Sequence, residues 1–118
     1  MTINEWLEEF KESWLSKNIE DVLSLFSKDV TYYETPYIKV DSYDQLKEEW
    51  SVIREQKDMY LNLQLFTSQE NKHAVIWHLG YSESTSSYRE LSGTYLIKLN
   101  DEGLCTYFHQ TGELKPNC

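Results

Sequence analysis

Glu34 is the residue of this sequence best suited to acid–base chemistry. It lies near the end of a β-rich run, in Tyr32-Tyr33-Glu34-Thr35-Pro36. Proline has no N–H to donate and keeps the residue before it out of helical geometry, so a strand ends here in a rigid turn. A carboxylate held among aromatic rings loses hydration, which raises its pKa toward the range that suits proton abstraction near neutral pH. Glu34 is therefore the predicted base if the chain is an enzyme, with Tyr33 as a hydrogen-bond donor; the alternative is an exposed glutamate at a sheet edge.

Histidine is the other residue type that does acid–base work near neutral pH, and the chain has three. His109, in Tyr107-Phe108-His109-Gln110, is the second candidate for catalysis, and the alternative is an ordinary satisfied or exposed histidine. The three histidines are scattered and no C-x-x-C or H-E-x-x-H pattern occurs, so no zinc site is predicted. Serine and cysteine have no recognisable nucleophile motif, and four glycines form no phosphate-binding loop. We expect neither a metal nor a cofactor.

Large apolar side chains are plentiful, and aromatic residues make up 14% of the chain. Their simplest role is the core, because aromatic rings supply most of the apolar area that a small domain buries. Their functional role would be a pocket wall that stacks on a flat apolar ligand, and in a cone-shaped fold the two roles overlap. The predicted ligand-binding residues are Trp14, Trp50, Leu63, Trp77, Tyr81 and Tyr95.

The spacing of apolar residues predicts the elements that hold these side chains. The first helix has an apolar stripe at three- and four-residue steps, with Thr2 and Glu5 as a capping box at its start. A second, shorter helix follows, and a third begins after Ser42. From Met59 onward apolar and polar residues alternate, as in strands with one buried face, with a polar loop over 82–87. Three helices followed by a four-strand meander indicate an α+β fold, with the helices on one side of a curved antiparallel sheet.

Length, charge and cysteine content narrow the class of protein. A chain of 118 residues has the size of one domain, which we expect to span residues 1–118. The formal net charge of −9 disfavours nucleic acid and anionic membranes as partners, because such a surface repels phosphate groups. No basic-then-apolar leader is visible, and no apolar run approaches the about 20 residues that a membrane helix needs. Cys105 and Cys118 make no disulfide scaffold, so we expect a reduced, cytoplasmic protein.

In its order of elements the chain resembles the nuclear transport factor 2-like superfamily, and within it the SnoaL-like, polyketide-cyclase-like branch. The resemblance covers about residues 6–110, and its local cues are Leu25-Phe26-x-x-Asp29-Val30-x-Tyr32, Thr35-Pro36-Tyr37, Ala74-Val75-Ile76-Trp77 and Leu91-x-Gly93-x-Tyr95. It implies a cone-shaped α+β fold whose open end admits small, mostly apolar ligands, and a homodimer formed through the outer face of the sheet. Relatives include isomerases, dehydratases, epoxide hydrolases, cyclases and non-enzymatic binders, so the fold does not fix the function.

The resemblance leaves two positions open for the carboxylate base of the family's ketosteroid isomerases. Counting forward from Phe26 puts this base at Glu34, whereas counting back from Pro36 puts it at Thr35. Residues adjacent along a strand point to opposite faces, so only one of the two can face the inside of the cone.

The rest of the isomerase set does not match this chain. The family's phenol donor falls near Phe10, which cannot donate, and its protonated-acid partner falls near Thr94 or Tyr95, where no carboxylate stands. Without two donors there is no oxyanion hole, so ketosteroid-isomerase chemistry is not expected.

These observations favour a homodimeric cone that holds a small hydrophobic or aromatic molecule, with no specific activity assigned. The alternative is a cofactor-free isomerase, cyclase or dehydratase that uses Glu34 with Tyr33, Tyr95 or His109. A third interpretation is a structural dimerisation module that recruits another protein. Dimerisation is expected through outward-facing apolar residues of the strands, which include Tyr60, Phe66, Ile76 and Leu96.

Overall fold

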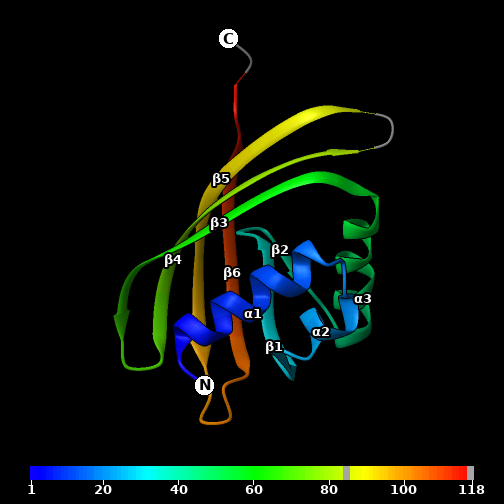
Figure 1. Cartoon of the computed structure of the whole chain (residues 1–118). Helices are drawn as coiled ribbons and strands as arrows, with labels where there is room; N and C mark the ends of the chain where they lie inside the picture. Colours follow the sequence, from blue (N-terminus) through cyan, green and yellow to red (C-terminus); the bar gives the residue numbers. More distant parts are fainter. Residues whose placement is uncertain (84–85, 117–118) are drawn as a thin grey trace.

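Helices come first and the sheet follows, in the order that the sequence predicts (Figure 1). A computed structural model of the chain describes residues 1–83 and 86–116. The elements are α1 (Ile3–Leu15), α2 (Ile19–Leu23), β1 (Phe26–Thr35), β2 (Ile38–Val40), α3 (Tyr43–Trp50), the 3-10 helix η1 (Ser51–Glu55), β3 (Gln56–Gln69), β4 (Lys72–Glu83), β5 (Ser86–Leu99) and β6 (Cys105–Leu114).

The strands form one curved, six-stranded sheet in the order β2-β1-β6-β5-β4-β3. Neighbouring strands are antiparallel, except that β1 and β6 are parallel. The helices lie together on one side of the sheet, and α1 crosses over its strands (Figure 1). The predicted α+β fold, with helices across the concave face of a mainly antiparallel sheet, is confirmed.

Side-chain caps determine where the first two helices begin. The Thr2 hydroxyl accepts a hydrogen bond from Glu5 N at 3.2 Å, and the Glu5 carboxylate accepts one from Thr2 N at 3.0 Å, so the predicted capping box is present. In the same way the Asn18 side chain accepts a hydrogen bond from Asp21 N at 3.1 Å at the start of α2.

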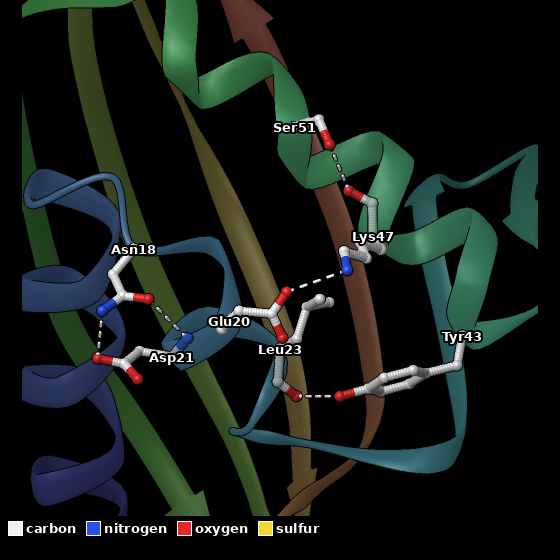
Figure 2. A network of polar contacts seen from close by, with 7 residues as sticks. All are labelled: Asn18, Glu20, Asp21, Leu23, Tyr43, Lys47 and Ser51. Atoms are coloured by element: carbon white, nitrogen blue, oxygen red, sulfur yellow. Dashed lines mark hydrogen bonds and ion pairs between the residues drawn. The ribbon is translucent and has the colours of Figure 1, made fainter.

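Two contacts join α2 to α3 (Figure 2). The Tyr43 hydroxyl donates a hydrogen bond to Leu23 O at 2.7 Å, and Lys47 Nζ lies 3.0 Å from Glu20 Oε1. The ion pair is exposed and contributes little, whereas the half-buried Tyr43 bond holds the first turn of α3 against α2. Together they help to set which face of α3 is turned toward the sheet.

Aromatic rings fill the inside of the cone. Phe10 is fully buried at their centre, and ring centroids between 5.4 and 6.3 Å away belong to Trp14, Phe26, Trp50, Tyr95 and Phe108. Edge-to-face pairs of this kind each add about 0.5–1.5 kcal/mol beyond the apolar area that they bury. The interior is therefore mostly a packed core.

One boundary differs from the prediction. Strand β4 runs to Glu83 and β5 begins at Ser86, so the ends of the predicted polar loop over 82–87 belong to strands, and residues 84 and 85 lie outside the described residues. The third helix ends at Trp50, and Ile53 reaches the core from η1 with 1% of its surface exposed. Of the helices within 1–83 and 86–116, none has the length and apolarity needed to cross a membrane.

Candidate functional site

Glu34 lies on the inner face of β1. Tyr32, two residues earlier, is 5% exposed and belongs to the core, and Glu34 lines the same cavity as Tyr32. The hydroxyl of Thr35 accepts hydrogen bonds from Tyr37 N at 3.2 Å and Ile38 N at 3.1 Å, so this side chain stabilises the turn instead. Of the two registers left open by the sequence, the structure has Glu34 on the inside.

Beside Glu34 is a cavity of about 110 Å³, which we call the Glu34 cavity. Trp14 Nε1 donates a buried hydrogen bond to Gln56 Oε1 at 2.9 Å, which ties α1 to the start of β3 in the wall of this cavity. The residues that line it come from α1, β1, α3, η1, β3 and β6, and are Trp14, Tyr32, Glu34, Glu49, Trp50, Val52, Ile53, Gln56 and Gln110.

Two carboxyl groups share the Glu34 cavity, Glu34 from β1 and Glu49 from α3. Burial raises the pKa of Glu34 above its ordinary value, and the Glu49 carboxyl raises it further through repulsion and through a hydrogen bond to the protonated form. None of the described residues that line the cavity is basic, so no lysine or arginine in this wall neutralises the pair. Glu34 therefore holds its proton to a higher pH than a free glutamate does.

The wall also carries two buried donors, the Tyr32 hydroxyl and the Trp50 indole N–H. Burial raises the pKa of Tyr32 well above its ordinary value, so the hydroxyl stays neutral. The Trp50 N–H is near enough to that hydroxyl to act against this rise in pKa. Trp50 Nε1 itself is buried with no hydrogen-bond partner of good geometry in the described part of the chain.

Tyr33 and His109, the other predicted catalytic residues, lie away from Glu34. They pair across the parallel strands β1 and β6, and their ring centroids are 5.3 Å apart. Because Tyr33 is adjacent to Glu34 along β1, both rings belong to the outer face of the sheet. The structure therefore does not bring Tyr33 or His109 into the cavity of Glu34, and Tyr32 is the tyrosine that lines it.

Trp14 and Trp50 are the predicted ligand-contacting residues that line the Glu34 cavity. Trp77 and Tyr95 are 2% and 1% exposed and stack on each other with ring centroids 5.5 Å apart, which makes them core residues. Burial also raises the pKa of Tyr95, so its hydroxyl is not a proton donor near neutral pH. Leu63 and Tyr81 do not line this cavity and are half-buried against the core.

The residues predicted from the sequence do not include the other polar side chains that line the Glu34 cavity, which are Glu49, Gln56 and Gln110. As a charged residue of a helix whose other face is apolar, Glu49 is expected on the solvated side. A signal was available, because Glu49 follows Leu46 by three residues and precedes Ile53 by four, and both are buried. That spacing puts Glu49 at the edge of the apolar stripe.

A serine also lies beside a histidine, away from the Glu34 cavity. Ser68 Oγ is 2.7 Å from His73 Nδ1, and the two residues are directly opposite each other in the pairing of β3 with β4. They are exposed cross-strand neighbours near a hairpin, where such pairs stabilise the sheet. In the part of the chain that the structure describes, no three His, Cys, Asp or Glu side chains gather as a metal site.

Comparison with known proteins gives the fold a name. No family model matches the sequence, and no curated protein matches it. Similar solved structures include an NTF2-like protein of unknown function from an Exiguobacterium species, 18% identical, with 92% of this chain and 98% of that chain covered and a TM-score of 0.77. A Delta 5-3-ketosteroid isomerase from a Mycobacterium species is 15% identical, with 94% and 96% covered and a TM-score of 0.78. The epoxide hydrolase/cyclase-like enzyme SalBIII is 11% identical, with 93% and 89% covered and a TM-score of 0.81. Such identities show the fold alone, and the chain has the nuclear transport factor 2-like fold.

Proposed function

We propose that this protein binds a small molecule in the Glu34 cavity. The observation that carries the proposal is a cavity lined both by aromatic rings and by two carboxyl groups. An apolar part of the ligand would pack against Trp14 and Trp50, and a polar group would lie beside Glu34. This combination of apolar walls and a few convergent polar groups is typical of ligand sites.

The volume limits the ligand. About 110 Å³ is the space of three or four water molecules, at about 30 Å³ each, and is below the about 300–1,000 Å³ of drug-sized sites. The expected hydrophobic or aromatic ligand is therefore either a compound small enough to fit entirely in the cavity, or a larger one that inserts only an end group. The rest of a larger ligand would lie over Val52, which is 61% exposed.

The four tryptophans provide the test. Trp14 and Trp50 line the Glu34 cavity, whereas Trp6 and Trp77 do not. We expect that, in a screen of compounds with fewer than ten heavy atoms, a binder shifts the indole N–H NMR signals of Trp14 and Trp50 and leaves those of Trp6 and Trp77 in place. Binders that move only Trp6 or Trp77, or a screen without binders, would contradict the proposal.

A second candidate function is cofactor-free acid–base catalysis, as an isomerase, cyclase or dehydratase. It is supported by the raised pKa of Glu34 and by its pairing with Glu49. Glu34 would exchange a proton with the bound substrate, and the neighbouring Glu49 would favour the protonated form of Glu34 through repulsion and a hydrogen bond. Once a substrate is known, Glu34→Gln should lower turnover by about 10²-fold or more and spare binding. Unchanged turnover in this variant would show that Glu34 is not the catalytic base.

We also propose that two copies associate through the outer face of the sheet. Phe66, Tyr60 and Leu96 are 71%, 53% and 46% exposed, and a stable interface should bury about 1,000 Å² or more in total. Light scattering at tens of micromolar should give twice the mass of the chain, 14.1 kDa, and Leu96→Lys should reduce it to the monomer. A wild-type monomer at that concentration would contradict this proposal and leave the binding proposal intact.

A further inference from the structure

We infer that a groove on the outer face of the sheet binds a small carboxylate that carries an apolar body. The groove, which we call the lysine groove, lies beside Lys72 at the start of β4 and Lys98 near the end of β5. It shares no lining residue with the Glu34 cavity, so it is a second site. Three features carry the inference: a pair of lysines, an apolar floor and a volume that suits a small molecule.

Cross-strand pairing places the lysine groove on the sheet. Lys72 is directly opposite Lys98, and Lys98 is directly opposite Tyr107, so the three side chains form one row across β4, β5 and β6. Two residues along the strands, Ala74 is opposite Leu96 and belongs to the next row on the same face. Leu96 is exposed, whereas both of its neighbours in the sequence are buried in the core. The rows therefore lie on the outer face, opposite to the helices (Figure 1).

Two positive charges meet at one end of the groove. Residues directly opposite each other in an antiparallel pair have Cβ atoms about 4.5–5.5 Å apart, and like charges there destabilise the sheet. Within the described residues, neither Lys72 nor Lys98 forms an ion pair, and no acidic residue lines the groove. Burial lowers the pKa of His73, the third basic residue of the lining, so the charge near pH 7 belongs to the lysines. An anion between the two ammonium groups would remove their repulsion and accept a hydrogen bond from each.

An aromatic ring holds one of these ammonium groups beside the groove. Lys98 Nζ lies 5.1 Å from the centre of the Tyr107 ring, and both residues line the groove. The attraction between a cation and a ring face favours this conformation of the lysine. A ligand therefore meets a charge that is already in place.

The floor of the groove is apolar. Ala74 is a small residue whose direct partners, Thr67 on β3 and Leu96 on β5, are larger, so it leaves a hollow between them. The exposed Leu96 side chain offers apolar area that a ligand can cover. The groove has a volume of about 600 Å³, within the about 300–1,000 Å³ of small-molecule sites. An alkyl or aromatic body can lie on this floor while its carboxylate reaches the lysines.

The charge of the whole chain favours a small anion over a large one. A formal net charge of −9 repels nucleic acid, anionic membranes and acidic proteins. Charges more than about 8–10 Å away are largely screened at physiological ionic strength, so a single carboxylate in contact with the two lysines experiences mainly their attraction.

Three compounds separate the contributions of the lysines and the floor. The probe is 3-phenylpropionate; 3-phenylpropan-1-ol keeps the apolar body without the charge, and acetate keeps the carboxylate without the body. A ligand of the probe's size allows a dissociation constant on the order of 1–10 mM. NMR titration of the backbone amide signals of Ala74 and Lys98 measures it.

We expect 3-phenylpropionate to bind several-fold more tightly than either of the other compounds. Lys72→Gln and Lys98→Gln should each weaken it by about two- to fivefold and leave the alcohol unaffected. Raising the salt concentration from about 0.05 to 0.5 M should also weaken the carboxylate and spare the alcohol. The matched control is Lys39→Gln, which removes an exposed lysine of β2 that does not line the groove and should change neither affinity.

The outcomes separate this inference from the proposed function. If the alcohol binds as tightly as the carboxylate, or if Lys39→Gln weakens binding as much as Lys72→Gln, the lysine groove does not recognise the anion and the inference is overturned. Leu96 also belongs to the proposed dimer face, so a second copy is the competing occupant. If light scattering gives a dimer and no groove signal moves up to about 50 mM 3-phenylpropionate, the inference is overturned as well. Neither result bears on the Glu34 cavity, whose ligands are detected at Trp14 and Trp50.

Discussion

The hydrogen bond between Trp14 and Gln56 offers a quantitative test of how the wall of the Glu34 cavity is held. Trp14→Phe keeps an aromatic ring but removes the N–H that lies 2.9 Å from Gln56 Oε1. Gln56 is 6% exposed, so water does not readily replace the lost donor. An unsatisfied buried acceptor costs about 1–3 kcal/mol. The smaller ring also leaves a void, which adds about 1 kcal/mol, so the free energy of unfolding should fall by about 2–4 kcal/mol.

The reciprocal change separates the hydrogen bond from the packing. Gln56→Met leaves the Trp14 N–H unpaired and should cost about 1–3 kcal/mol by itself. In the double variant both polar groups are gone, so its loss should be smaller than the sum of the single losses by about 1–3 kcal/mol. Urea unfolding followed by circular dichroism gives the free energy of unfolding of the wild type, the two single variants and the double variant. The comparison holds when the dependence of that free energy on urea concentration is the same in all four.

A control pair guards against a general effect of either substitution. Trp77→Phe removes an indole that donates to Thr111 O at 3.2 Å and does not line the Glu34 cavity. The losses of unfolding free energy in Trp77→Phe and Gln56→Met should therefore add in the double variant. If the losses in Trp14→Phe and Gln56→Met also add within about 0.5 kcal/mol, the hydrogen bond between Trp14 and Gln56 does not stabilise the wall and the reasoning is refuted.

Three further predictions concern stability. Because folding raises the pKa of Glu34, the stabilisation from its proton is complete below about pH 4.5 and is lost as the pH rises through the raised value. Glu34→Gln should therefore raise the free energy of unfolding at pH 7 and flatten its pH profile in urea titrations; a profile identical to that of the wild-type protein would count against a desolvated Glu34. Phe10→Ala empties the centre of the core and should cost about 3–5 kcal/mol, lowering the melting temperature in calorimetry by about 10–25 °C; a loss under about 1 kcal/mol would mean that the cone is not packed there. Tyr43→Phe removes the hydroxyl that binds a carbonyl of α2 and should cost about 0.5–1.5 kcal/mol in urea unfolding, whereas Tyr37→Phe, at a side chain 97% exposed, should cost nothing; equal effects would deny the bond a role.

Much of the fold was predictable because it depends on local signals. The capping box at Thr2 and Glu5 marks the start of α1, and the alternation from Met59 marks the inner face of β3. Strand β2 was not predictable in this way, because three residues from Ile38 to Val40 are too short to show a period. It exists through pairing with β1, a contact that the turn after Pro36 brings about.

The candidate site was predictable only in part, because it depends on which elements meet. Glu34 was identified from its place before a proline turn, but its register could not be fixed, since the pairing of β1 with β2 is irregular between Tyr33 and Thr35. Glu49 was missed because its approach to Glu34 depends on how α3 is rotated, which the Tyr43 contact with α2 helps to set (Figure 2). Tyr33 is next to Glu34 in the sequence but does not share its cavity, because adjacent residues of a strand face opposite sides of the sheet.

The central claim is that Glu34 and Glu49 face each other inside the cone, and NMR titration of the glutamate side-chain carboxyl carbons tests it most directly. Glu34 should titrate above the ordinary range of a glutamate side chain, because burial and the neighbouring carboxyl both raise its pKa. In Glu49→Gln its titration should move back toward that range without reaching it, since the burial remains. A Glu34 that titrates in the ordinary range in the wild-type protein, unchanged by Glu49→Gln, would contradict the account.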